Sequence, residues 1–189
     1  MNRLMALTLL ILLIPLTLIL SLLIFLFIDK KIFFTQQRIS LNKKFKCYKF
    51  ATLKYNELNE CNKPSHLETH RINYLGRIIR NFFLDEILQL INIIKGDINF
   101  FGPRPLPVYE DLEYQKKIIF WNKRNVIKAG LTGLAQSRGY AGSIKNIDQL
   151  KKRHLYDLLY IKIIKKKNII STYKINLIIL TNTLLLFLR

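Results

Sequence analysis

The sequence predicts a helix-rich α+β protein with an N-terminal membrane helix, one small β-hairpin, and further helices and long loops at the membrane surface. Three observations predict this class. Half of the 189 residues are hydrophobic, which excludes a disordered chain. Aromatic and β-branched residues recur over 32–53 as in paired strands. Apolar residues spaced three and four apart over 72–95 indicate a helix.

The first 28 residues form the predicted membrane-embedded helix. Arg3 is their only charged side chain, and 25 uncharged residues follow it. At ~1.5 Å per residue, a helix of that length reaches ~37 Å, enough to cross the hydrocarbon core. Pro15 predicts a kink near the middle, because it lacks a backbone N–H. The segment either spans the bilayer or bends at Pro15 and leaves on the side it entered. Basic residues at both ends, Arg3 and Lys30–Lys31, place residues 29–189 on the cytoplasmic face.

Positive charge concentrates toward the C-terminus. The chain holds 31 Lys and Arg against 12 Asp and Glu, a formal net charge of +19. Residues 114–189 alone contain sixteen basic and two acidic residues. An apolar beginning and a strongly basic end fit a protein on an anionic phospholipid membrane. No nucleic-acid partner is expected, because the apolar start and the lack of a recognition motif argue against one.

The segments that follow the membrane helix can be predicted in chain order. Residues 32–53 form a hairpin that turns at the polar stretch 41–44. The polar residues 54–70 form a loop. A single helix over 72–95 then ends at Gly96.

Prolines, glycines and apolar runs divide the second half of the chain. Loops are expected at 101–107, 130–133 and 139–142, and helices over 110–122 and 151–162. The apolar stretch 175–188 is too short, at fourteen residues, to cross a bilayer comfortably. It is therefore predicted to lie on the membrane surface or in the core.

Two adjacent carboxylates, Asp85 and Glu86, stand inside the apolar helix pattern. Burying two such groups among Phe and Leu is costly unless a cation compensates. A divalent cation such as Mg²⁺, held together with phosphate groups, would do so. The alternative is a solvated stripe of the helix, with Arg80 and Lys95 as partners. The residues alone leave both interpretations open.

Two arginines lie in stretches suited to anion binding. Arg104 sits between Pro103 and Pro105, so its stiff loop loses little entropy when the guanidinium grips a phosphate. Arg138 follows a glycine-containing loop that would let an anion approach closely. An ordinary proline-rich turn with an exposed Arg is the alternative for the first. Together with the carboxylates, these residues point to phosphoryl chemistry on a diphosphate at a membrane.

The same residues resemble a known family, the bacterial sugar transferases, which are monotopic polyprenyl-phosphate phosphoglycosyl transferases. The resemblance covers about residues 1–185, and the apolar start with its central proline is similar to that family's re-entrant membrane helix. The blocks that carry it, in order, are Phe33–Arg38, Phe45–Phe50, Leu84–Asn92, Lys95–Asp97, Gly102–Pro105, Lys128–Gln136 and Asp157–Tyr160.

The resemblance implies a reaction and a set of partners. A nucleoside-diphosphate sugar, usually a UDP-sugar, gives its sugar phosphate to polyprenyl (undecaprenyl) phosphate, and UMP leaves. The reaction needs Mg²⁺ and is the first membrane step of surface polysaccharide assembly. It takes place at the cytoplasmic face of the bacterial inner membrane. Which sugar is transferred, and whether the chain forms a homo-oligomer, stay open.

The resemblance also implies residue roles. Asp85 would attack the phosphate and carry a covalent phosphosugar, and Glu86 would act beside it, the two also holding Mg²⁺. The residues that would contact substrate or its phosphates are Lys49, Arg80, Arg104, Arg138 and Asp157.

Several positions depart from the family's pattern. They include Ala51, Phe83, Leu88 and Tyr140. These departures motivate a second hypothesis from another class, a membrane-surface scaffold of the same family with weakened catalysis.

Overall fold

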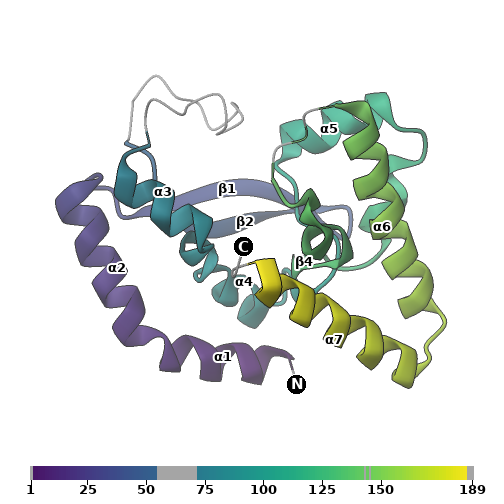
Figure 1. Ribbon diagram of the computed structural model, residues 1–189, viewed down its shortest axis with the longest axis horizontal. Coiled ribbons are helices and arrows are strands. Elements are labelled where there is room, and N and C mark those ends of the chain that lie inside the picture. The colour runs from purple at the N-terminus through teal and green to yellow at the C-terminus, as the bar shows by residue number, and fades with distance from the viewer. Residues whose placement is uncertain (1, 55–71, 143, 145, 187–189) are drawn as a thin grey trace. The chain divides into compact units, whose positions relative to one another are not determined.

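The computed structural model describes residues 2–54, 72–142, 144 and 146–186 (Figure 1). The predicted loop over 54–70 lies outside the described residues apart from Lys54. The chain forms two compact units. The first comprises Met1–Gln36 and Lys46–Gly96, and the second Gln37–Phe45 and Asp97–Arg189. Helices predominate and the strands are few and short, so the helix-rich α+β class is confirmed.

The first unit begins with two helices, α1 (Asn2–Leu12) and α2 (Ile14–Phe27). They are bent by 59° at the break between them. Pro15 lies in the first turn of α2, where backbone N–H groups have no partner within the helix, so its missing N–H does not weaken α2. The same missing N–H cannot make the hydrogen bond that would continue α1. The predicted kink is therefore confirmed. Whether the pair spans a membrane or re-enters stays a prediction.

A hairpin follows, formed by β1 (Phe33–Ser40) and β2 (Lys43–Phe50). The two-residue turn between them has both Leu41 (φ 51°) and Asn42 (φ 57°) in the left-handed region. That pattern matches the right-handed twist of the strands. The predicted hairpin and the position of its turn are confirmed.

The helix predicted over 72–95 is not continuous. Helix α3 (Tyr74–Asn81) ends at Phe82 and Phe83, a 3₁₀ turn covers Leu84–Glu86, and α4 (Gln89–Lys95) follows. The break arises at Phe83, whose left-handed backbone (φ 52°) no α-helix accommodates. Gly96 ends α4 at φ 85°, as predicted.

Asn92 fastens α4 to the open edge of β2. Its side-chain Oδ1 accepts from the Tyr48 N–H at 3.1 Å, and its Nδ2 donates to the Lys46 carbonyl at 2.8 Å. The Asn92 amide thus takes the place of a third strand's peptide group. Because Asn92 is fully buried, both backbone groups depend on it.

The apolar core of the first unit lies between α2, the hairpin and the α3–α4 region. Its buried members are Leu20, Ile24, Ile28, Phe50, Ile79 and Leu88. Helix α1 packs against α4 (Figure 1). Asn73 joins two further elements, because its Oδ1 caps the start of α3 while its Nδ2 donates to the Phe27 carbonyl at the end of α2.

The second unit contains a short parallel pair, β3 (Asn99–Phe101) and β4 (Gly130–Thr132). The prediction of a loop at 130–133 is therefore wrong for most of that stretch. The glycines serve close backbone approach instead of a turn. A Cβ on Gly102 would lie 2.6 Å from the Lys128 carbonyl oxygen and 2.8 Å from the Gly130 nitrogen.

The remaining helices of the second unit differ from prediction mainly at their ends. They are α5 (Val108–Lys117), a 3₁₀ turn (Trp121–Val126), a π-helical turn (Gln136–Tyr140), α6 (Ile147–Lys165) and α7 (Ile169–Leu186). The helix expected over 110–122 ends at Lys117, because Ile118 adopts an extended backbone, and the left-handed Phe120 (φ 62°) then precedes the 3₁₀ turn. The loop expected at 139–142 begins inside the π-helical turn, at Gly139 (φ 87°).

Helix α7 is longer than the sequence predicted. It begins at Ile169 and has 18 residues, so the argument that this stretch is too short to cross a membrane is wrong. Among the described residues, α7 is the one helix that is long and apolar enough to cross; the bent pair α1 and α2 would add a second if it forms one span.

Replacing Asn92 by Ala should destabilise the first unit. The Tyr48 N–H and the Lys46 carbonyl, both part-buried, would lose their partner in the core, at a cost of about 2–4 kcal/mol. We expect Tm to fall by about 5–15 °C, measured by thermal unfolding of the full chain in nanodiscs. Asn81→Ala, an exposed position at the end of α3, is the matched control. Equal Tm values for the two variants would contradict the edge-capping role.

Candidate active site

Asp85 and Glu86 lie in the 3₁₀ turn between α3 and α4 and are buried, each only 7% exposed. They do not form a solvated helix stripe. The left-handed backbone of Phe83 ends α3 and changes the direction of the chain, and the Phe83 N–H donates to the Arg80 carbonyl at 3.0 Å. The 3₁₀ turn that follows carries Asp85 and Glu86 into the interior. Lys95, the other partner considered for a solvated stripe, donates instead to the Tyr48 hydroxyl at 3.0 Å.

Lys49 of β2 supplies the positive charge that both carboxylates need. Its Nζ lies 2.6 Å from Glu86 Oε1 and 3.4 Å from Asp85 Oδ2. The Lys49 side chain is itself only 13% exposed. One ammonium is thus shared by two adjacent carboxylates in a place where water screens little, and the Arg80 guanidinium acts on Asp85 as a second positive charge.

Burial raises the pKa of Asp85 above its ordinary value. Lys49 opposes that rise, Glu86 adds to it, and Arg80 opposes it more weakly. A carboxylate with a raised pKa is more basic and hence a better nucleophile once ionised, and Lys49 favours the ionised form. The structure thus brings together Lys49, Arg80, Asp85 and Glu86 in the first unit.

The carboxylate pair fits Mg²⁺ as it binds in phosphate-processing sites. Mg²⁺ is usually held by one or two carboxylates together with water and substrate phosphates, without an all-protein cage. Within the described residues, no group of three or more His, Cys, Asp or Glu side chains could hold a metal ion. The two carboxylates of Asp85 and Glu86 have the chemistry that such a site requires, and the binding of Mg²⁺ itself stays a prediction.

Asp157 and Arg104 belong to the second unit and are linked through a residue that the sequence analysis missed. Arg124 donates from Nε to Asp157 Oδ2 at 2.9 Å and from Nη2 to the Arg104 carbonyl at 2.8 Å. Asp157 is 1% exposed. Burial raises its pKa, while Arg124 and Arg153 oppose that rise. Arg124 and Asp157 are 33 residues apart in sequence, so no local pattern pairs them.

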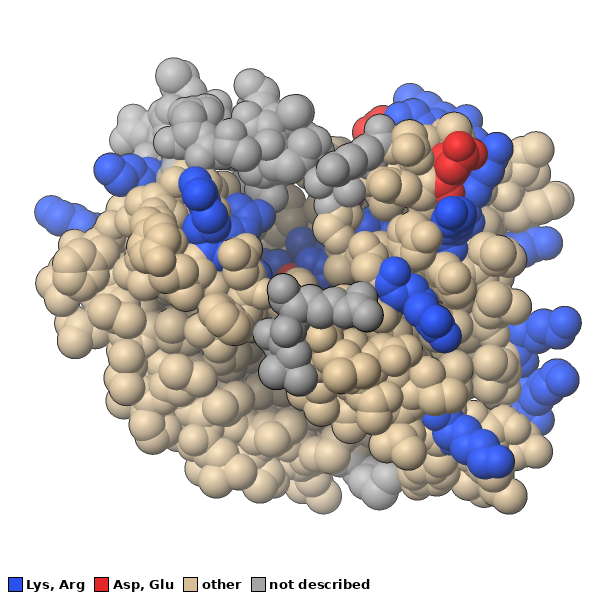
Figure 2. Space-filling model, in the orientation of Figure 1, with Lys and Arg blue, Asp and Glu red and all other residues tan. Residues whose placement is uncertain are grey.

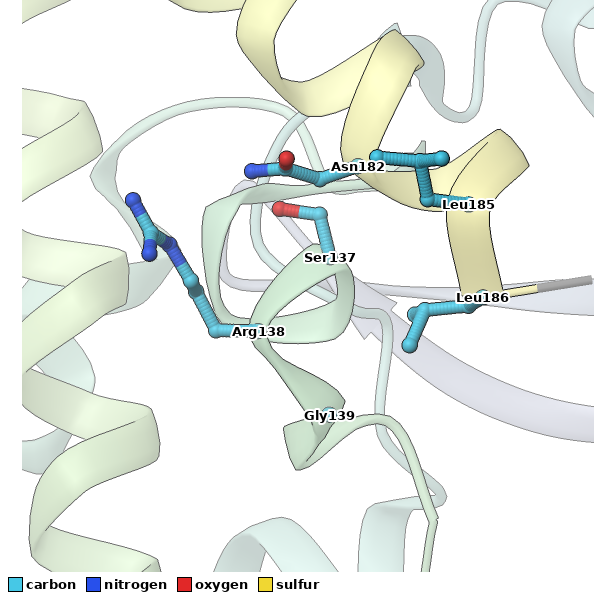
Figure 3. A pocket seen from close by; sticks show the side chains of 6 residues that line it. All are labelled: Ser137, Arg138, Gly139, Asn182, Leu185 and Leu186. Atoms are coloured by element: carbon cyan, nitrogen blue, oxygen red, sulfur yellow. The ribbon is translucent and has the colours of Figure 1, made fainter. Parts of the chain in front are cut away.

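Arg138 lines a cavity of about 250 Å³ between the π-helical turn and α7. Figure 3 shows its residues, which are Ser137, Arg138, Gly139, Asn182, Leu185 and Leu186. The polar atoms of Ser137, Arg138 and Asn182 face one side, and the two leucines line the other (Figure 3). This cavity is thus polar at one side and apolar at the other.

Comparison with known proteins identifies the family. A model of the bacterial sugar transferase family matches residues 1–188. The chain therefore belongs to the bacterial sugar transferases, which confirms the resemblance recognised from the sequence motifs.

Individual relatives are similar over smaller parts of their length. A Klebsiella pneumoniae protein named UDP-glucose:undecaprenyl-phosphate glucose-1-phosphate transferase is 32% identical over 132 residues, 69% of this chain and 28% of the relative. The UDP-N-acetylgalactosamine-undecaprenyl-phosphate N-acetylgalactosaminephosphotransferase of Aeromonas hydrophila is 30% identical over 69% of this chain and 31% of its own. The exopolysaccharide production protein PSS of Rhizobium leguminosarum bv. phaseoli is 29% identical over 78% of this chain and 76% of its own. The chain thus spans less than a third of the first two.

Replacing Lys49 by Met should destabilise the chain in a pH-dependent way. Removing one partner of a buried ionic cluster costs about 3–5 kcal/mol at neutral pH. Because the folded-state pKa of Asp85 is raised, the protonated form is favoured in the fold. The contribution of Asp85 to the free energy of unfolding is therefore fully present below the ordinary carboxyl pKa. It is lost as the pH rises through the folded-state pKa of Asp85.

The loss of unfolding free energy that Lys49→Met causes, relative to the unchanged chain, should therefore become smaller as the pH falls from 8 toward 4. Thermal unfolding across that range measures it. Lys46→Met, an exposed lysine on the same strand, should show little deficit at any pH. A deficit for Lys49→Met that does not change with pH would mean that Lys49 contributes through packing rather than charge.

Proposed function

We propose that this chain transfers a sugar phosphate from a UDP-sugar to polyprenyl phosphate through a covalent intermediate on Asp85. The observation that carries the proposal is the buried Asp85–Glu86 pair with Lys49 between them. The family to which the chain belongs supports the same reaction class, as do the names of two relatives, both of which describe transfer of a sugar phosphate to undecaprenyl phosphate.

The first half-reaction forms a bond between Asp85 and phosphorus. A carboxylate oxygen of Asp85 attacks the phosphorus that bears the sugar. The bond from that phosphorus to the bridging oxygen of the diphosphate breaks, and UMP leaves with the bridging oxygen and its electron pair. The product is an aspartyl phosphosugar, a mixed anhydride that remains reactive. Lys49 and Arg80 offset the negative charge that the diphosphate brings to two carboxylates.

The second half-reaction restores the enzyme. A phosphate oxygen of polyprenyl phosphate attacks the same phosphorus, and the bond to the Asp85 oxygen breaks. The lipid leaves as a diphosphate-linked sugar, and Asp85 is again a free carboxylate. Dividing the transfer into two steps lets a soluble donor and a membrane-bound acceptor use one nucleophile in turn.

Asp85 and Glu86 would hold Mg²⁺, which when bound neutralises charge on the phosphate oxygens. Arg104 and Arg138 are proposed to contact phosphate groups of the substrates. The cavity at Arg138 supports a lipid acceptor, because a polar side beside two leucines suits a phosphate attached to a hydrocarbon chain.

The exposed apolar surface of α1 and α2 supports a proposal of membrane attachment. Thirteen large apolar side chains of α1 and α2 are more than a third exposed. Soluble monomeric proteins rarely expose so much apolar surface, and where they do it marks an interaction site. In Figure 2 the surface over α1 is tan, whereas Lys and Arg side chains stand out along α6. We propose that α1 and α2 enter the cytoplasmic leaflet of the inner membrane and that the basic side chains along α6 contact the anionic headgroups of that leaflet.

The proposal is tested by intact-mass measurement of the purified chain after incubation with UDP-sugars and Mg²⁺. We expect a mass increase of one phosphosugar group, mapped to Asp85 and released by hydroxylamine as an acyl phosphate. Asp85→Asn should abolish the adduct, because a neutral amide is not nucleophilic at phosphorus. Asp148→Asn, the same change at an exposed position, should retain it. Absence of an adduct with every donor would favour the catalytically weakened scaffold.

The metal requirement is tested separately through Glu86. Chelation of Mg²⁺ should abolish adduct formation in the unchanged chain. Glu86→Gln should raise the Mg²⁺ concentration needed for half-maximal adduct at least about tenfold, because a neutral amide replaces one of two anionic ligands. An unchanged Mg²⁺ dependence would remove Glu86 from the metal site.

A further inference from the structure

The proline loop of the second unit is held by its backbone carbonyls. Prolines at 103, 105 and 107 donate no hydrogen bonds, so the loop can be fixed only through its acceptors and its two remaining N–H groups. Four consecutive carbonyls each receive a donor: Pro103 from Gly130 N at 2.9 Å, Arg104 from Arg124 Nη2 at 2.8 Å, Pro105 from Arg38 Nη1 at 2.9 Å, and Leu106 from Ile39 N at 3.1 Å.

Arg124 is the donor that acts directly on the residue proposed to bind phosphate. Proline rings fix φ near −65° on both sides of Arg104. The orientation of the Arg104 peptide plane is therefore the principal freedom left, and the bond from Arg124 to its carbonyl fixes that plane. The direction in which the Arg104 side chain leaves the loop depends on it.

The Arg124 guanidinium is itself fixed on every side. It is 1% exposed, pairs with Asp157 through Nε, and has Nη1 3.9 Å from Asp111 Oδ1. The Arg124 Cζ atom lies 4.9 Å from the centre of the Trp121 ring. A side chain so enclosed does not reach a substrate, so its effect on a reaction must pass through its neighbours.

Asp111 extends this support into α5. Its Oδ1 accepts from Trp121 Nε1 at 2.8 Å and its Oδ2 from Gln115 Nε2 at 2.8 Å. Asp111 is fully buried. Arg124 thus ties α5, α6 and the proline loop together through bonds that are all within the second unit.

We propose that Arg124, with Asp157 as its counter-ion, is a positioning residue that orients Arg104 toward a substrate phosphate. The inference rests on the proposed function, in which Arg104 contacts that phosphate. It gives Asp157 a role through Arg124 rather than at the substrate. Neither residue touches the reacting atoms.

The loop itself is tested by hydrogen exchange in the full chain. The amides of Arg104 and Leu106 are the exchangeable sites between the prolines. Arg124→Gln removes the charge and the guanidinium that donates both to Asp157 and to the Arg104 carbonyl. Hydrogen exchange of the peptide covering 101–107 should therefore become at least about tenfold faster. Lys123→Gln removes one positive charge from an exposed neighbour on the same turn and should leave exchange unchanged.

A double-mutant cycle tests whether Arg124 acts through Arg104. In the unchanged background, Arg124→Gln should lower kcat/KM for the UDP-sugar by about 10–100-fold. In an Arg104→Ala background the same change should cost less than about threefold, because the group it positions is gone. Arg124→Lys keeps the charge opposite Asp157 with a different geometry and should restore part of the loss.

The outcomes separate the two proposals. If Arg124→Gln does not fold, Arg124→Lys and Asp157→Asn carry the same cycle. Exchange that is unaffected by these variants, or equal losses in both backgrounds, would overturn the positioning role. A chain that makes no product in any form would count against the proposed function, and the exchange result would still decide whether Arg124 holds the loop.

Discussion

A buried pair of neighbouring carboxylates is the constraint around which the first unit is organised. Asp85 and Glu86 lie where water screens charge poorly, and the Lys49 ammonium contacts both carboxylates while Arg80 adds a second positive charge near Asp85. That arrangement requires β2 to lie beside the 3₁₀ turn. Asn92 secures it by bonding α4 to the edge of the strand that bears Lys49. The charge balance of the site is thus built into the packing of the fold.

In the second unit the corresponding constraint is the proline loop at 103–107, which must be held in place by other segments. Such a loop has a stiff backbone but few donors, so other segments must supply them. Two neighbouring residues of β1, the Gly130 amide and the buried Arg124 guanidinium supply these four donors. These hydrogen bonds cannot be predicted from local sequence patterns, because Arg38, Arg104 and Arg124 are far apart along the chain. The fold places them on one short stretch of backbone.

Much of the architecture could be predicted from local chemistry. Pro15 marked the kink, the polar stretch at 41–44 marked the hairpin turn, and Gly96 marked a helix end. Asp85 and Glu86 stood out because acids are scarce in this chain. The predictions failed where a residue adopted a backbone that its side chain disfavours. Phe83 and Phe120 are both left-handed, and no sequence rule expects an aromatic residue there.

Other failures have equally specific causes. The glycines around β4 looked like a loop because close backbone approach and turns use the same residue. The start of α7 was missed although Asn168 caps it, with Oδ1 accepting from the Ser171 N–H at 3.0 Å. The pairing of Arg124 with Asp157 depends on tertiary packing, so a single sequence carries no signal for it.

The hairpin also shows how the outer edges of a two-stranded sheet are partly satisfied by other segments of the chain. A two-stranded sheet ordinarily presents two unsatisfied edges that invite another polypeptide to add a strand. Here Asn92 occupies the outer edge of β2, and the bridge of Arg38 to Pro107 occupies part of the outer edge of β1. Each edge of the ribbon thus has part of its hydrogen-bonding capacity taken up by other segments of the chain, which leaves less of it to pair with a further strand.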